Sequence, residues 1–510
     1  MAVVEFIDSA EGGRRRIRLA NPATLAPLGE IEIQTSDEVR AAVEGARKAQ
    51  AEWGGLSFSE RGNSMRRALR VLLARQDEFA ERIVRETGKP VVEVLTSEIM
   101  PACDALAFYA RRSAKILADR RVRTHLAKNK KLRIIYRPVG VVGIITPWNF
   151  PFMLSLNPTV QALMAGNAVV LKPSEATPVA GVLLEELFVS AGLPEGLFTV
   201  VQGDGSTGQA LVESEVDKIS FTGSVRTGRI VGELCGRRLL PCTLELGGKD
   251  PMIVCADANL ERAANGAVWG AFANAGQVCT STERVYVVED VADEFTELVV
   301  KKTGELRQGA IGEFDVGSVI WPPQLEIIER HVNEAVERGA VLRTGGRRNP
   351  DLDGIFYEPT VLTDVTHDMQ VMREETFGPV LPIMRVRDEA EAISLANDST
   401  YGLNASIWTR NKHKGVELAD ALQSGSVVVN DCMVSYGVAE SPFGGMKDSG
   451  IGRANGEAGL RSYCHTRSIL VDRFGGKSEP MWYPYSPRMQ KLVGRTMRFI
   501  WGTPLGRLFS

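Results

Sequence analysis

Two residues of this chain, Cys279 and Glu245, have side chains that together suit covalent catalysis. Cys279 follows Gly276-Gln277-Val278, and Glu245 lies in the run from Leu244 to Lys249. A thiolate is a strong nucleophile, and a carboxylate can take a proton from water, so the pair suits a two-step reaction with a covalent intermediate. A single cysteine is more often a packing residue, and a single glutamate is more often solvated. The interpretation therefore depends on the motifs that accompany the pair.

Alternating helices and strands are expected to position these residues. Residues 36–118 read as helices that begin at an N-cap in Ser36-Asp37-Glu38, and the basic stretch 119–133 reads as a hairpin or an exposed arm. The expected strands are 141–145, 168–171, 198–201, 218–221 and 252–254, with helices at 179–191 and about 260–274, and the pattern continues to about 430. This alternation predicts parallel sheets covered by helices, which bind ligands at the carboxyl ends of their strands.

Two glycine-rich segments are candidates for binding a phosphate. Residues 203–208 form a GxGxxG pattern, but the acidic residue expected about 20 positions later is missing, because residue 228 is glycine. We interpret this segment as a plain turn between a strand and a helix. Residues 221–228 are the better candidate, since Ser224 can cap the following helix and leave backbone N–H groups directed at a phosphate.

Composition narrows the class of protein. The 510 residues are 44% hydrophobic and 24% charged, which predicts a globular protein of more than one domain. The net charge of −3 gives no reason to expect nucleic acid as a partner. The seven cysteines form no CxxC pair and the five histidines have no metal-ligand spacing, so we expect reduced thiols and no metal.

The sequence gives no sign of secretion or of a membrane span. The N-terminus has no basic segment followed by an apolar stretch, so no signal peptide is expected. No apolar run approaches the roughly 18 residues that cross a bilayer. We therefore expect a cytoplasmic protein.

Seven motifs occur in an order that resembles the aldehyde dehydrogenase superfamily, over about residues 20 to 470. They are 146–151 (TPWNFP), 172–175 (KPSE), 223–228 (GSVRTG), 244–249 (LELGGK), 276–279 (GQVC), 374–379 (EETFGP) and 442–450 (PFGGMKDSG). The resemblance implies an α/β fold of two tandem domains with open twisted sheets, one of them Rossmann-like, and a small β oligomerisation arm. Seven motifs in order make a plain α/β protein without this activity a poor alternative.

The resemblance implies a catalytic role for three residues. Cys279 would be the nucleophile that attacks the aldehyde carbon. Asn149 and the Cys279 backbone N–H would form the oxyanion hole, and Glu245 would activate the water that hydrolyses the thioester.

The resemblance also implies a site for NAD, with NADP possible. Lys172 would hold the adenosine ribose, Glu375 the nicotinamide ribose, and Phe377 would pack against the nicotinamide. The residues expected near the pyrophosphate are Ser224, Gly223 and Trp148. The alternatives are that Trp148 and Phe377 are core aromatics and that Lys172 is a solvated lysine.

Two sequence features bear on cofactor choice and on the walls of the site. A carboxylate at Glu175 would repel the 2′-phosphate of NADP, which predicts a preference for NAD. Val278 and Thr376 depart from the residues usual in relatives.

The implied domain boundaries follow the motifs. Residues 1–120 and 141–247 are expected to form the NAD-binding domain, and 248–445 the catalytic domain. Residues 121–140 and 446–470 are expected to form the oligomerisation arm and its partner strand, in a homodimer or homotetramer. Residues 471–510 would be a C-terminal basic amphipathic extension.

The expected activity is oxidation of an aldehyde to a carboxylic acid. The segment 150–158, which should line the aldehyde tunnel, is apolar and carries no arginine, and it resembles the class 3 branch that acts on fatty and aromatic aldehydes, as does Asn430-Asp431. Parts of the chain also resemble bacterial succinate-semialdehyde dehydrogenases, which remain the alternative. A CoA-acylating dehydrogenase is less favoured because such relatives lack the glutamate at the position of Glu245, and an intact Cys279 argues against a non-catalytic protein.

The last segment differs in composition from the rest of the chain. Residues 480–510 contain no acidic residue. On a helix of about 100° per residue, Arg488, Lys491, Arg495 and Arg498 fall on one side and Met489, Val493, Met497 and Ile500 on the other, with Arg507 beyond them. This pattern predicts a helix that serves a membrane surface or the substrate entrance. The alternative is that its apolar stripe packs on a neighbouring subunit.

Overall fold

A six-stranded sheet forms the centre of the first half of the molecule. The computed structural model describes residues 3–7, 14–479 and 481–504. The strand order is β18-β10-β9-β6-β7-β8, with every neighbouring pair parallel except β10 and β18. The strands are β6 (Val141–Ile145), β7 (Ala168–Lys172), β8 (Phe198–Val200), β9 (Lys218–Thr222), β10 (Cys242–Glu245) and β18 (Gly450–Ile451). The predicted strands in this region are confirmed.

Helices cover this sheet, as the alternating pattern predicts. The helices are α1 (Ser36–Gly55), α2 (Phe58–Ala74), α3 (Gln76–Thr87), α5 (Met100–Ile116), α6 (Pro151–Ala165), α7 (Val179–Ser190), α8 (Gly205–Glu213) and α9 (Val225–Arg238). β6 and β7 are buried along their whole length, which explains why they read as continuous apolar runs. Trp53 of α1 is buried and donates its indole N–H to the Leu163 carbonyl of α6 at 2.8 Å.

Two predicted helix ends differ from the structure. The N-cap of α1 is Thr35 rather than Ser36: the Thr35 hydroxyl accepts the Glu38 N–H, and the Glu38 carboxylate accepts the Thr35 N–H at 2.8 Å. This reciprocal capping box explains the difference, because it requires a glutamate three residues after the cap. Helix α10 ends at Phe272, because the next residues turn out of the helix to carry Cys279.

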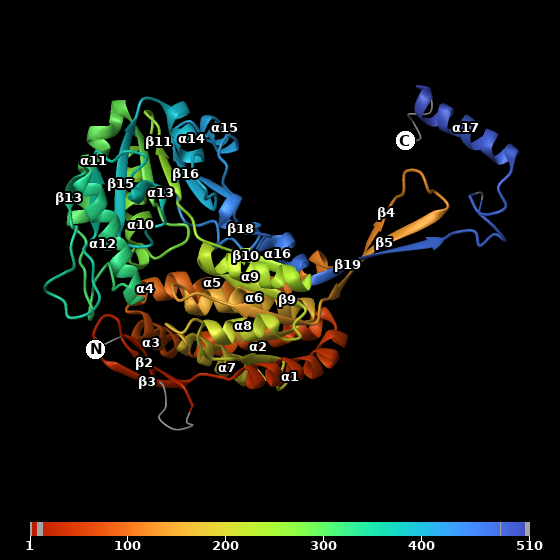
Figure 1. Ribbon diagram of the computed structural model, residues 1–510, viewed down its shortest axis with the longest axis horizontal. Helices are drawn as coiled ribbons and strands as arrows, with labels where there is room; N and C mark the ends of the chain where they lie inside the picture. The colour runs from red at the N-terminus through yellow and green to blue at the C-terminus, as the bar shows by residue number, and fades with distance from the viewer. Residues whose placement is uncertain (1–2, 8–13, 480, 505–510) are drawn as a thin grey trace.

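A seven-stranded sheet forms the centre of the second half. Its order is β13-β14-β15-β12-β11-β16-β17, and only the edge strand β13 is antiparallel to its neighbour. The strands are β11 (Pro251–Val254), β12 (Arg284–Val288), β13 (Val341–Thr344), β14 (Thr360–Thr363), β15 (Val380–Val386), β16 (Asn404–Trp408) and β17 (Ser426–Val429). Its helices include α10 (Leu260–Phe272), α11 (Glu289–Gly304), α12 (Pro322–Glu337), α14 (Glu389–Asn397) and α15 (Lys412–Asp420). Figure 1 shows this half stacked on the helices and sheet of the first half.

Two smaller antiparallel sheets complete the fold. β1 (Val4–Ile7), β2 (Arg16–Ala20) and β3 (Pro27–Glu32) lie beside the first half. β4 (Arg120–Val122) and β5 (Lys130–Pro138) form the predicted basic hairpin, and β5 pairs along its whole length with β19 (Cys464–Asp472). This three-stranded arm projects from the body (Figure 1).

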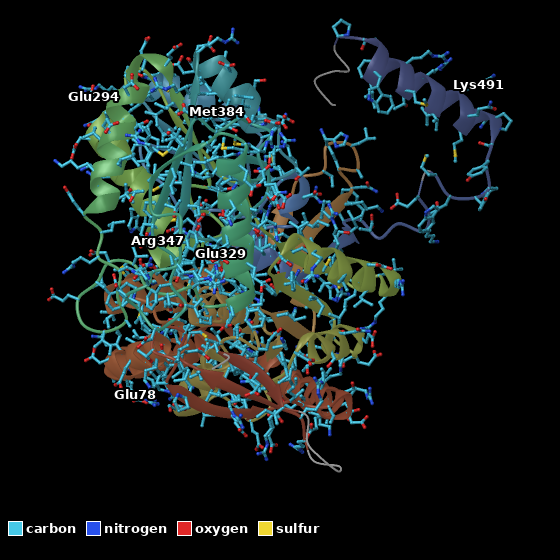
Figure 2. All side chains as sticks on the ribbon, turned by 60° about the vertical axis from the view of Figure 1, so that its left-hand side comes forward. Glu78, Glu294, Glu329, Arg347, Met384 and Lys491 are labelled. Carbon is cyan, nitrogen blue, oxygen red and sulfur yellow. The ribbon has the colours of Figure 1, made fainter. Side chains whose placement is uncertain are left out.

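The predicted tail helix is α17 (Pro487–Gly502), capped by Ser486. It stands apart from the body beyond the arm in both views, and Figure 2 marks Lys491 on it. Asn129 and Lys130 at the start of β5 bind Glu479, which ties the root of the tail to the arm. Pro480 and Arg507, which the tail prediction includes, lie outside the described residues. Within the described ranges, no helix is long and apolar enough to cross a bilayer.

Candidate active site

A cavity of about 900 Å³ brings all ten predicted site residues together. Its walls contain Cys279, Glu245, Asn149, Lys172, Glu175, Gly223, Ser224, Trp148, Glu375 and Phe377. These residues come from both halves of the chain. The fold therefore places segments that are more than a hundred residues apart in the sequence around one cavity.

The carboxyl ends of the parallel strands form one wall of this cavity. Ile145 pairs with Lys172 across β6 and β7, and Glu245 pairs with Thr222 across β10 and β9. Because the strands run in the same direction, their last residues lie at the same edge of the sheet. The side chains that follow these strands are therefore neighbours, although the sequence separates them.

Cys279 lies in a loop with an uncommon backbone conformation. Asn274 and Ala275 have φ values of 51° and 53°, and Gly276 has a φ of 73°. A Cβ on Gly276 would lie 2.1 Å from the Gly378 carbonyl oxygen, so only glycine fits there. Gln277 holds the loop from within, because its Oε1 accepts the Ile320 N–H at 2.8 Å.

The surroundings of the Cys279 thiol favour its protonated form. Burial raises its pKa well above the usual range, and the negative charges of Asp250, Glu375 and Glu245 raise it further. A thiol in this environment needs a proton acceptor or a nearby positive charge before it can act as a nucleophile. The electrostatic surroundings of Cys279 therefore favour the thiol over the thiolate.

Asn149 follows β6 and reaches the Cys279 loop. Its Nδ2 donates to the Gln277 carbonyl at 3.0 Å, which leaves its second N–H available. Asn149 Oδ1 is buried without a hydrogen-bond partner among the described residues. The Asn149 carbonyl in turn accepts Nδ2 of Asn274 at 3.1 Å. The predicted oxyanion donor is thus bonded directly to the loop that carries the predicted nucleophile.

Glu245 is a buried carboxyl group without hydrogen-bond donors. It is 5% exposed, and neither of its oxygens has a hydrogen-bond partner in the described part of the chain. The neighbouring Ala454 N–H is committed to the Phe443 carbonyl at 2.8 Å. Burial raises the pKa of Glu245 well above its ordinary value, and the charge of Arg453 opposes this shift. A carboxyl group of this kind is suited to exchanging a proton with a bound water.

Lys172 and Glu175 form an ion pair in the wall of the cavity. Lys172 Nζ lies 2.9 Å from Glu175 Oε2, and Lys172 is only 4% exposed, so it is not a solvated lysine. Ser224 caps α9 as predicted, since its hydroxyl oxygen accepts the Thr227 N–H at 3.2 Å. The remaining N–H groups of that helix end are available to an anion.

Trp148 and Phe377 pack edge to face, with ring centroids 5.4 Å apart. Both line the cavity, so neither is a core aromatic. Phe377 has a φ of 49°. Beside it, Glu375 accepts the Gly248 N–H at 2.9 Å, and burial together with the charge of Glu283 raises the pKa of Glu375 to about 8.

A buried ion pair beneath Phe377 was not predicted from the sequence. Lys249 Nζ lies 2.5 Å from Glu283 Oε2, and Glu283 accepts the N–H groups of Thr376 and Phe377. Lys249 also donates to the Thr376 hydroxyl at 3.1 Å. This pair supports the uncommon backbone of Phe377. The sequence feature that could have indicated this ion pair is Thr376, where relatives usually have another residue, because its hydroxyl can accept a hydrogen bond from a buried lysine.

The cavity also contains residues that the sequence did not single out. Gly205 and Gly208 of the GxGxxG segment line it, as do Trp321 and Gln324 at the start of α12. Gly203 and Asp204 lie between β8 and α8, and residues 205–208 form the first turn of α8, so the segment interpreted as a plain turn also begins the helix. Among the described residues, no three side chains of histidine, cysteine, aspartate or glutamate gather as a metal site would require.

Comparison with known proteins identifies the family that this site resembles. Residues 6–469 match the model of the aldehyde dehydrogenase family. A 4,4'-diapolycopene aldehyde oxidase from Methylomonas sp is 42% identical over 477 residues, which cover 93% of this chain and 89% of that protein. A putative succinate-semialdehyde dehydrogenase [NADP(+)] from Mycolicibacterium smegmatis is 42% identical over 483 residues, covering 92% and 93%. The crystal structure of a Mycobacterium tuberculosis aldehyde dehydrogenase complexed with NAD+ superposes with a TM-score of 0.87 at 35% identity, covering 90% and 95%.

Proposed function

We propose that this chain, which belongs to the aldehyde dehydrogenase family, oxidises an apolar aldehyde to a carboxylic acid through a thioester on Cys279. It is an NAD-dependent aldehyde dehydrogenase. The proposal concerns the residues that carry the reaction and the kind of aldehyde.

The cavity fits a dinucleotide. The capped end of α9 suits the pyrophosphate, and Lys172 with Glu175 suits the hydroxyls of the adenosine ribose. Glu375 suits the second ribose: a Cβ on Gly247 would lie 2.2 Å from Glu375 Oε2, so glycine is needed for this carboxylate to lie where it does. When bound there, NAD supplies the hydride acceptor that converts the thiohemiacetal to the thioester.

The residues of the chain perform the other steps. The Cys279 thiol loses its proton to solvent as its sulfur bonds to the aldehyde carbon. The second N–H of Asn149 Nδ2 and the Cys279 backbone N–H stabilise the charge on the aldehyde oxygen. Glu245 takes a proton from water, whose oxygen bonds to the thioester carbon. The carbon–sulfur bond then breaks, the Cys279 thiolate takes the proton held by Glu245, and the carboxylic acid leaves.

One observation carries this proposal: the buried carboxyl group of Glu245, whose oxygens have no hydrogen-bond partner among the described residues, lines the same cavity as Cys279. A buried carboxyl group without donors is costly for folding, so a catalytic use explains its presence. The presence of Glu245 also favours hydrolysis of the thioester over transfer of the acyl group to CoA. The test is NADH formation with and without CoA: acid as the only product supports the proposal, and a strict need for CoA refutes it.

An apolar substrate is supported by the helix that follows Asn149. Phe152, Met153 and Leu154 of α6 are buried, and Leu154 lines the cavity. The charge of Arg453 lowers the pKa of Glu245, so this guanidinium lies near the site. Its Nη1 donates to the Gly445 and Gly452 carbonyls, so that nitrogen is already occupied and is not offered to a substrate carboxylate. The Methylomonas relative is named for an aldehyde of a long hydrocarbon, 4,4'-diapolycopene.

Succinate semialdehyde is the second candidate, because the M. smegmatis relative is named for it. A kcat/KM panel that runs from short acidic semialdehydes to octanal and benzaldehyde separates the two. Higher kcat/KM for the apolar aldehydes is expected. A large preference for succinate semialdehyde would overturn the proposed substrate class without affecting the roles of Cys279 and Glu245.

We propose a division into domains and an oligomeric state for the same chain. We assign residues 1–120 and 141–247 to NAD binding and 248–445 to catalysis.

β19 is an edge strand with exposed Ile469, Leu470 and Val471, which suits pairing with a second copy in a homodimer or homotetramer. The mass of the protein in solution by light scattering tests this: a monomer would refute it.

The tail is proposed to bind an anionic lipid surface. α17 has no buried side chain, and no acidic residue occurs from 481 to 504. Trp482 and Trp501 are exposed and suit the level of lipid headgroups. Basic residues near such a surface contribute about 1 kcal/mol each, so attachment should be weak and salt-sensitive.

Sedimentation with phosphatidylserine liposomes tests the tail. The full chain should sediment at low salt, and a version ending at Glu479 should not. If both stay in solution and the truncation lowers the oligomer mass, the apolar side of α17 packs on another subunit instead.

A further inference from the structure

A short segment outside the cavity contacts the backbone on both sides of the proposed oxyanion hole. This segment, residues 89–99, contains Lys89, helix α4 (Val91–Val94) and a π-helical turn, η1 (Leu95–Ile99). π-helical turns often occur near functional sites. Its two acidic residues, Glu93 and Glu98, accept backbone N–H groups of two separate segments, the loop after α10 and the first turn of α6.

Glu98 holds the helix that begins just after Asn149. It is fully buried, and its Oε2 accepts the N–H groups of Phe152 and Met153 at 3.1 and 2.9 Å. These are free donors of the first turn of α6, where a carboxylate is favoured. Its Oε1 lies 2.6 Å from Lys89 Nζ, which itself lies 4.2 Å from the ring centre of Phe150. The chain that follows Asn149 is therefore fixed in place.

Glu93 holds the loop that leads to Cys279. Its two oxygens accept the Asn274 N–H at 3.0 and 3.1 Å. Asn274 is the first of the residues with left-handed backbone, a conformation that most L-residues avoid and that Asn tolerates better than most. The same Asn274 donates from Nδ2 to the carbonyls of Asn149 and Gln277, both at 3.1 Å. Glu93 thus acts on Asn149 through a single residue.

We propose that Glu93 and Glu98 are positioning residues for the oxidation: from one segment they set the spacing between the Asn149 amide and the Cys279 backbone N–H. The proposal rests on the proposed function, in which those two donors share the aldehyde oxygen. Neither carboxylate lines the cavity. Their effect should therefore fall on the transition state, where charge develops on that oxygen, and not on NAD binding.

The variant Glu93→Ala tests the role proposed for Glu93. Removing the acceptor frees Asn274 but leaves both oxyanion donors present, so kcat should fall by about 10- to 100-fold, less than the roughly 100- to 1,000-fold seen when an oxyanion donor is lost outright. The KM for aldehyde and the Kd for NAD should stay within about threefold of the wild type. Glu93→Gln keeps an oxygen for the Asn274 N–H and should recover most of kcat. Glu81→Ala removes an exposed charge from neighbouring α3 and is the matched control.

A double-mutant cycle separates positioning from general destabilisation. If Glu93 acts through Asn149, adding Glu93→Ala to Asn149→Ala should lower kcat by less than about threefold further, because the interaction is already lost. Full additivity of the two losses would overturn the proposal. So would equal damage from Glu93→Gln and Glu93→Ala.

Glu98 requires paired variants, because removing one member of a buried ion pair leaves an unpaired charge. Lys89→Met with Glu98→Gln keeps an acceptor for the Phe152 and Met153 N–H groups without any charge. Lys89→Met with Glu98→Leu removes that acceptor. The proposal expects a lower kcat for the second pair at similar NAD affinity, and equal kcat for both would refute the role of Glu98.

Alkylation of the wild type with iodoacetamide distinguishes failure of this proposal from failure of the proposed function. If modification of Cys279 does not track the loss of activity, the proposed function is wrong. If it does, and folded Glu93→Ala still turns over like the wild type, only the role of Glu93 is wrong.

Discussion

Asn149 donates its side-chain amide to the carbonyl of Gln277, two residues before Cys279, at 3.0 Å. This bond joins the loop after β6 to the loop after α10, which belong to different halves of the chain. It also orients the second Asn149 N–H. The proposed oxyanion donor is therefore held by a hydrogen bond to the loop that carries the proposed nucleophile.

Cys279→Ala should abolish turnover and leave NAD binding intact.

Glu245→Gln should allow one hydride transfer and then stop at the thioester, because no base activates water. Steady-state kcat should fall by about 100- to 10,000-fold, while a burst of NADH equal to the number of sites remains. Stopped-flow absorbance measures both. Wild-type steady-state activity in Glu245→Gln, without CoA or another acceptor, would refute the assignment.

The pH dependence of kcat should report Glu245. Burial raises its pKa, so the active carboxylate is lost as pH falls while pH is still above the ordinary carboxyl range. Arg453 opposes that shift, so Arg453→Met should raise the pKa of Glu245 further and move the acid limb of the kcat profile to higher pH. Lys301→Met, at an exposed position on α11, should leave the limb unchanged. An unmoved or acid-shifted limb in Arg453→Met contradicts this account.

Glu175→Ser should increase the use of NADP. The carboxylate of Glu175 lies 2.9 Å from Lys172 Nζ, so it both repels a 2′-phosphate and occupies the cation that would bind one. The wild type is expected to prefer NAD, and the variant should gain at least about tenfold in kcat/KM for NADP, equivalent to about 1.4 kcal/mol. Glu195→Ser, an exposed position, is the charge control. Comparable kcat/KM for both cofactors in the wild type would contradict the preference.

Gly276→Ala should destabilise the protein and reduce its activity. The φ of 73° disfavours alanine, and the new Cβ would meet the Gly378 carbonyl oxygen at 2.1 Å, so the Cys279 loop must shift. A loss of roughly 1–3 kcal/mol of unfolding free energy is expected. Gly236→Ala is the matched control, because it lies in α9 with open space around it and should be neutral or slightly stabilising. Chemical denaturation of both variants measures the difference, and equal stability would show that the loop tolerates a side chain.

Local patterns in the sequence determined the elements and the candidate residues. The buried runs of β6 and β7, the Ser224 cap and the amphipathic α17 could all be predicted, because strand burial, helix capping and helical periodicity depend on neighbours in the chain. The site residues were found through motifs whose order the family shares.

Only the tertiary structure decided how those residues are supported. Lys249, Glu283 and Glu93 are charged residues that a sequence places on the surface by default, because charges are rarely buried without a partner. Their partners are distant in sequence, so no local pattern reveals them. The bond from Asn149 to Gln277 has the same origin: it exists because parallel strands end at one edge of a sheet and the second half of the chain packs against that edge.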